Sequence, residues 1–141
     1  MKRFCYLLGI TVVLGIALVQ VRSGTVSAQE TLTSGTVLQR TELKSAPGSE
    51  AILVLRNVPP GAQSGKHTQG GNEIVYILDG SAILEVQGKP PATLKAGEAF
   101  STAAGEVHNV KNASTSAPLK ALAFYVAKKG ARLEDLAVPA K

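Results

Sequence analysis

The chain has 141 residues, of which 45% are hydrophobic and 18% are charged, and its formal net charge is +5. Three of the positive charges (Lys2, Arg3 and Arg22) lie within residues 1–28, so residues 29–141 carry a net charge of only +2 (5 − 3). So small a charge gives no electrostatic case for binding nucleic acid or anionic membranes. The single cysteine, Cys5, excludes an intrachain disulfide and a multi-cysteine metal site.

The first 28 residues have the layout of a secretory signal peptide. A basic start is followed by a nearly uncharged apolar run over residues 6–21 and by the small-residue site Val26-Ser27-Ala28. We expect cleavage after Ala28, a periplasmic or secreted protein, and no stable membrane association after cleavage. The alternative is an uncleaved anchor, because the apolar run approaches the ~18 residues that begin to indicate a membrane span.

The mature chain reads as one β-rich domain. Residues 29–35 are small and polar and predict a flexible lead. Residues 36–43 and 51–58 predict strands, the first near a sheet edge and the second, AILVLRNV, buried because it is almost continuously apolar. Pro59-Pro60-Gly61 ends the second strand, since proline cannot donate to a sheet ladder. Two hairpins are expected next, one at Asp79-Gly80 and one at Gly88-Lys89.

Short strands continue to residue 128, with turn signals every 8–12 residues, which indicates a sandwich or barrel. The further strands are expected within residues 98–102, 106–112 and 119–128. The sequence therefore predicts an all-β domain over residues 36–129 and a C-terminal tail over 130–141. Within the tail, ARLEDLA (131–137) is the one segment outside the signal peptide that suggests a helix.

Four polar residues that can bind a metal fall close to these predicted strands. His67 and Gln69 alternate along a strand and therefore project to one face, and Glu73 heads the next strand. We expect Gly70-Gly71 to form a tight turn with positive φ between them. His108, near the end of a later strand, would supply a fourth ligand. Imidazole, amide and carboxylate groups form a plausible first set of ligands for a divalent metal.

Two stretches of the chain resemble the two motifs of the cupin superfamily. The first, G-x5-H-x-H-x3-E-x6-G, is matched at Gly61, His67, Glu73 and Gly80, with Gln69 in place of the second histidine. The second, G-x5-P-x-G-x2-H-x3-N, is matched by Gly97, Gly105, His108 and Asn112, with Ala103 in place of proline. The motifs span residues 61–112, just under half of residues 29–141. The resemblance is to small single-domain cupins of the quercetin dioxygenase-like group.

The resemblance implies an antiparallel jelly-roll barrel, also called a double-stranded β-helix, with one divalent metal ion on its inner wall. Its ligands would be His67, Gln69, Glu73 and His108, and the ion would be Mn, Fe, Ni, Co or Zn. Two roles are open for Gln69, ligation through its carbonyl oxygen or orientation of a bound group by hydrogen bonding. If the protein is catalytic, Glu73 and Gln69 are the expected catalytic residues.

Other conspicuous residues have structural explanations. The motif glycines are expected at turns with positive φ, and Asn112 is expected to be structural. The aromatic residues are expected to line the core or the pocket; they are Tyr76, Phe100, Phe124 and Tyr125.

Three classes of function fit these features. The first is a dioxygenase-like enzyme acting on a small organic molecule. The second is a metal-dependent sugar or small-acid isomerase or lyase, which would need basic residues such as Arg56 or Lys66 in the cavity. The third is a non-catalytic small-molecule-binding protein, because one fold hosts many chemistries. A homodimer through the edge strand at residues 36–43 is a further expectation.

Overall fold

The computed structural model describes residues 35–133 and 135–136, which form ten strands and no helix. Every strand pairing is antiparallel. The strands are β1 (Thr36–Glu42), β2 (Ser49–Val58), β3 (His67–Thr68), β4 (Gly71–Asp79), β5 (Ser81–Val86), β6 (Ala92–Lys95), β7 (Ala99–Thr102), β8 (His108–Asn112), β9 (Leu119–Lys128) and β10 (Asp135–Leu136).

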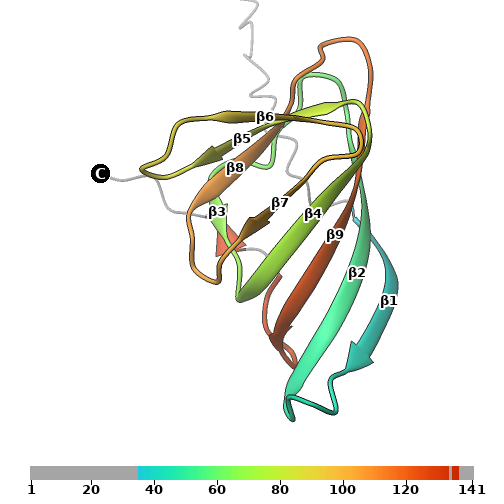
Figure 1. Ribbon diagram of the computed structural model, residues 1–141, viewed down its shortest axis with the longest axis vertical. Helices are drawn as coiled ribbons and strands as arrows, with labels where there is room; N and C mark the ends of the chain where they lie inside the picture. The colour runs from blue at the N-terminus through green and yellow to red at the C-terminus, as the bar shows by residue number, and fades with distance from the viewer. Residues whose placement is uncertain (1–34, 134, 137–141) are drawn as a thin grey trace, which may run out of the picture.

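The strands form two five-stranded sheets that face each other (Figure 1). The first sheet has the order β1-β2-β9-β4-β7, and the second has the order β10-β3-β8-β5-β6. Burial alternates along β4 and β9, so one face of the first sheet packs on the interior and the other faces solvent. The core lies between the sheets and includes Ile52, Ile77, Leu119 and Tyr125. The expected all-β fold of antiparallel strands is confirmed.

The turn at Gly80 does not close the hairpin that its Asp-Gly sequence predicts. Gly80 has φ of 82°, but β4 pairs with β7 and β9, whereas β5 pairs with β6 and β8. The chain therefore passes from one sheet to the other at this point. The second predicted hairpin, at Gly88, is confirmed, since β5 and β6 pair around it.

The C-terminal segment joins the second sheet instead of forming the helix expected over residues 131–137. Asp135 and Leu136 pair with Thr68 and His67 of β3. The helix prediction is wrong for these two residues, because pairing with β3 satisfies their backbone groups in the extended conformation. The structure thereby places part of the predicted tail beside the strand that carries His67.

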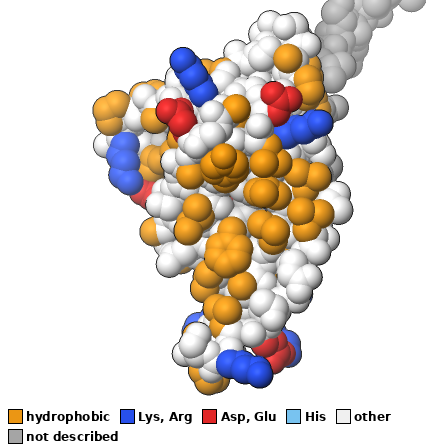
Figure 2. Space-filling view, turned by 45° about the vertical axis from the view of Figure 1, so that its right-hand side comes forward, with side chains coloured by type: hydrophobic (Ala, Val, Ile, Leu, Met, Phe, Trp, Pro, Cys, Tyr) orange, Lys and Arg blue, Asp and Glu red, His pale blue; other side chains and the backbone are white. Residues whose placement is uncertain are grey.

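The outward face of the first sheet is rich in hydrophobic side chains (Figure 2). Tyr76 is 45% exposed and Phe124 is 38% exposed, so the expectation that they line the core or pocket is wrong. Both lie at outward positions of strands whose two faces are apolar. All seven residues of β1 are exposed, and β1 is an edge of this sheet, as expected. The homodimer through β1 stays a prediction.

Two kinds of glycine appear in the motif region. Gly61, Gly80, Gly97 and Gly105 all have positive φ, as expected for turn residues. Gly71 does not, so the reason predicted for the Gly70-Gly71 pair is wrong. A Cβ on Gly71 would lie 2.3 Å from the carbonyl oxygen of Val126 on β9. Glycine is needed there because two backbones approach closely.

The predicted signal peptide (1–28) and nearly all of the flexible lead (29–35) lie outside the described residues, as do residue 134 and residues 137–141 of the predicted tail. Across residues 35–133 and 135–136, no helix has the length and hydropathy needed to cross a membrane.

Candidate metal centre

A cavity opens between the two sheets, and β9 provides much of its floor. The inward residues of β9 include Ala121 and Ala123, whose methyl groups leave space that a larger side chain would fill. The cavity volume is about 30 Å³, which leaves room for about two water molecules. Its lining comprises Arg56, Val58, His67, Glu73, Val75, Ile77, Phe100, His108, Val110, Leu119, Ala121, Ala123 and Tyr125.

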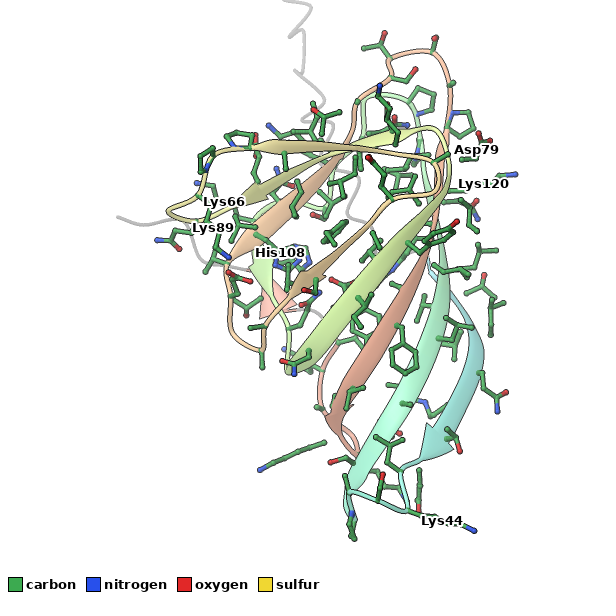
Figure 3. The ribbon with its side chains drawn as sticks, viewed as in Figure 1. Lys44, Lys66, Asp79, Lys89, His108 and Lys120 are labelled. Atoms are coloured by element: carbon green, nitrogen blue, oxygen red, sulfur yellow. The ribbon has the colours of Figure 1, made fainter. Side chains whose placement is uncertain are left out.

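Strand pairing brings the two histidines together. His67 on β3 lies directly opposite His108 on β8, and their ring centroids are 4.2 Å apart. Both are buried (4% and 1% exposed), and Figure 3 places His108 between the two sheets. Each Nδ1 lies near a backbone carbonyl oxygen, that of Gly65 at 2.9 Å for His67 and that of Glu106 at 3.0 Å for His108. When Nδ1 carries the proton, each Nε2 keeps its lone pair for a ligand.

Glu73 lies in a row of polar side chains across the first sheet. On β4 it is flanked by Thr102 on β7 and by Tyr125 on β9, each directly opposite it in register. All three are at least 95% buried. The Thr102 hydroxyl is 3.3 Å from Oε2 of Glu73 and 3.0 Å from Oε1 of Gln69, and its one proton can serve only one of them at a time. The sequence singled out Glu73 but missed Thr102, because an isolated threonine in a strand carries no motif.

Gln69 joins the carboxylate to the imidazole. Its Nε2 donates to Oε2 of Glu73 and lies 3.5 Å from Nε2 of His108. Its Oε1 accepts the Thr102 hydroxyl instead of facing the histidines. Ligation of a metal through Oε1 would therefore require the amide to turn by about 180°. In this conformation Nε2 of Gln69, and not its Oε1, faces His108.

His67, Glu73 and His108 thus converge at one end of the cavity, with Gln69 between them. Oε2 of Glu73 and Nε2 of His108 are 3.7 Å apart, whereas two donors on one ion at ~2.1 Å would be roughly 3 to 3.4 Å apart. In the described part of the chain, no group of three or more His, Cys, Asp or Glu side chains is already set at ligand distances. The donor types fit a divalent transition metal.

Burial controls the protonation of the site. Desolvation is the main cause that lowers the pKa of His108, and the charge of His67 also lowers it. A neutral imidazole is the form that can ligate a metal. Burial is also the largest cause that raises the pKa of Tyr125, followed by the negative charge of Glu73, so this phenol stays protonated.

Arg56 is the basic residue that the structure brings into the cavity. It is only 9% exposed, and its Nη2 donates to the Tyr125 hydroxyl at 2.8 Å. Lys66, the other basic candidate, is exposed. Asn112 is structural, as expected: its Nδ2 lies within 3.1 Å of three backbone carbonyl oxygens, those of Val58, Pro59 and Ala117.

Residues 54–125 match the family model of the cupin domain, which covers half of the chain. This chain belongs to the cupin family. The matched segment runs from β2 to β9 and contains all four site residues. The predicted double-stranded β-helix is therefore confirmed by both the family match and the two-sheet architecture.

Relatives and solved structures agree with this assignment. The β-alanine degradation protein BauB of Pseudomonas aeruginosa is 41% identical over 68 residues, which cover 47% of this chain and 72% of BauB. A conserved protein with a double-stranded β-helix domain from Klebsiella pneumoniae has a TM-score of 0.57 and 22% identity, covering 74% of this chain and 83% of its own. The DMSP lyase DddQ of Ruegeria pomeroyi has a TM-score of 0.54 and 24% identity, covering 68% of this chain but only 46% of DddQ. At these identities the two structures show the fold alone.

Proposed function

We propose that this cupin is an exported metal-dependent enzyme that acts on a small organic molecule in its barrel cavity. The observation that carries the proposal is the grouping of His67, Glu73 and His108 at one end of an otherwise mostly apolar cavity. The three side chains would hold one divalent ion (Mn, Fe, Ni, Co or Zn). The similarity to BauB, a protein named for the degradation of β-alanine, supports a role in small-molecule metabolism.

Each polar residue of the site would have its own role in the reaction. His67 and His108 would present Nε2, because Nδ1 of each faces a backbone carbonyl. Glu73 would serve as a ligand and accept a proton, and Gln69 would orient the substrate with its amide. The apolar walls would exclude water from the reacting group. A bound ion would supply Lewis acidity and open coordination positions, which suits dioxygenase-like oxidation of the substrate.

A second candidate, a metal-dependent isomerase or lyase, is favoured by one specific observation. This class needs a basic residue in the cavity, and Arg56 lies there beside Tyr125. In such a reaction Glu73 would remove a proton from the substrate and the Tyr125 hydroxyl would hydrogen-bond to the developing negative charge. A non-catalytic binding protein would use the same cavity without turnover.

The test uses Co(II) as a spectroscopic probe of the purified protein. We expect about one equivalent to produce a visible ligand-field absorption, azide to shift that absorption by entering an open position, and His67→Ala/His108→Ala to abolish it. Lys66→Ala, which changes an exposed neighbour of His67, is the matched control. An azide-insensitive absorption would contradict the open position that the proposed reaction needs. Oxygen uptake with a panel of small acids, alcohols and sugars then separates the oxidation from the isomerase or lyase reaction, which consumes no oxygen.

Export is a separate part of the proposal and rests on residues 1–28. Cell fractionation and the mass of the mature N-terminus test it. Cleavage after Ala28 is the expected result, and a full-length protein in the cytoplasmic fraction would contradict it.

A further inference from the structure

The further inference concerns the outward face of the first sheet, which the proposed function does not use. We infer that this face is the contact surface of a homodimer, in which two copies of the chain pack sheet on sheet with their strands running in opposite directions. The contact differs from the pairing predicted for the edge strand β1, because it uses side chains on the face of the sheet and not backbone groups at its edge. The inference does not depend on the metal centre.

Hydrophobic side chains form one continuous block on this face. Five of them, on β4 and β9, are each more than a third exposed: Ile74, Tyr76, Leu78, Phe124 and Val126. Ile74 lies directly opposite Phe124, and Tyr76 lies directly opposite Leu122, so they form rows across the sheet. Leu53 and Leu55 on β2, both partly buried, continue these two rows. The block therefore extends across three neighbouring strands.

The outward face of the second sheet has a different character. On β5, Ile83 and Glu85 alternate with buried residues and therefore face outward. Ile83 is flanked by Thr93 on β6 and Lys111 on β8, and the Lys111 ammonium donates to Glu85 at 2.6 Å. The fold thus allows a polar outer face, and the apolar block on the first sheet indicates an interaction surface.

The size of the face matches what a dimer needs. The four longest strands of the first sheet, about 4.8 Å apart, and the roughly 26 Å from Lys120 to Lys128 along β9 give about 500 Å² of plan area. Protruding side chains raise the accessible surface above this value. Each partner in a standard interface contributes about 800 Å² of accessible surface. Two such faces packed about 10 Å apart would form a contact of ordinary size.

Charged residues at the two ends of the face favour a second copy as the occupant. Lys120 and Lys128 are exposed at opposite ends of β9, and Asp79 on β4 lies directly opposite Lys120. Figure 3 shows Asp79 and Lys120 together at one end of the sheet. When the strands of two copies run in opposite directions, the Asp79 end of each copy meets the Lys128 end of the other. A two-fold axis then makes this contact twice, whereas strands running in the same direction would bring the two Lys128 side chains together.

Sedimentation equilibrium of the purified protein tests the inference. We expect a species of twice the chain mass at micromolar concentration. Phe124→Glu and Tyr76→Glu should each raise the dimer dissociation constant by about 30-fold or more, because each places a charge within the apolar block. Ile83→Glu, which makes the same kind of change on the outward face of the second sheet, is the matched control and should leave the dimer intact. Circular dichroism checks that each variant folds, and if one of the face variants does not, the other decides.

A charge exchange tests the orientation of the two copies. Asp79→Lys should weaken the dimer by about fivefold or more, and Asp79→Lys/Lys128→Asp should restore it, since the opposite charges then meet again. Failure of the double variant to restore the dimer would overturn the proposed orientation. A dimer that survives both Phe124→Glu and Tyr76→Glu would overturn the inference in favour of pairing through β1. A wild type that stays monomeric at about 100 μM would also overturn it, and would leave the face to residues 1–34 of the chain or to a different partner.

Discussion

Replacement of Gln69 by leucine tests how the buried carboxylate is stabilised. In the structure the amide nitrogen of Gln69 donates to Glu73, and Glu73 is only 5% exposed. A hydrogen bond to a charged group contributes about 1.5 to 3 kcal/mol. We therefore expect Gln69→Leu to lower the free energy of unfolding of the metal-free protein by about 2 kcal/mol. A bound ion would take over as the partner of Glu73, so the metal-saturated protein should lose much less.

Folding and metal binding are thermodynamically linked, so the same variant should also change the affinity for metal. If Gln69→Leu destabilises the metal-free protein by about 2 kcal/mol and leaves the metal-bound protein unchanged, metal should bind roughly 30-fold more tightly, at 1.4 kcal/mol per tenfold. Urea denaturation gives the two unfolding free energies, and chelator competition gives the dissociation constant. Gln39→Leu, on the exposed strand β1, controls for the general effect of the substitution. Weaker metal binding in Gln69→Leu would refute this reasoning and identify Gln69 as a ligand.

Three further predictions concern the scaffold. Asn112→Leu should cost about 3 kcal/mol in urea denaturation, because three backbone carbonyl oxygens lose the two N–H donors that they share; a loss below about 1 kcal/mol would contradict this. Gly71→Ala should lower stability by about 2 kcal/mol, since its Cβ would meet the carbonyl oxygen of Val126 at 2.3 Å, and an unchanged melting temperature would show that β4 and β9 can separate freely. The hydrogen bond from Arg40 lowers the pKa of Glu50 below 4.5, so the stability gained from this pair is present above pH 4.5 and lost as the pH falls through the folded-state pKa. Wild type and Arg40→Met should accordingly converge in stability at acid pH, and a constant difference across the titration would contradict the pairing.

The sequence predicted the fold because its turn signals and strand patterns agreed with each other. The spacing from Gly61 to Gly80 brings His67 and Glu73 to one cavity, and pairing of β3 with β8 adds His108. These positions follow from the alternation of strands and from the two motifs. The predicted metal binding itself stays a proposal, because the described residues include no group of three or more His, Cys, Asp or Glu side chains already set to hold an ion.

Other features could not be predicted from a one-dimensional pattern. Strand β4 is apolar on both faces, so its sequence does not say that Tyr76 points outward. Asp79-Gly80 indicates a turn but not that the chain changes sheets there. Arg56 lies within an apolar run that suggested burial on both faces, and only the register with β9 shows that it points into the cavity.

Elemental analysis of the purified protein, without a histidine tag, tests the central claim most directly. The wild-type protein should contain close to one equivalent of Mn, Fe, Ni, Co or Zn, or take it up on incubation, and His67→Ala/His108→Ala should contain none while remaining folded. Absence of all five metals from the wild type after incubation with each, or equal metal content in the double variant, would contradict the metal centre.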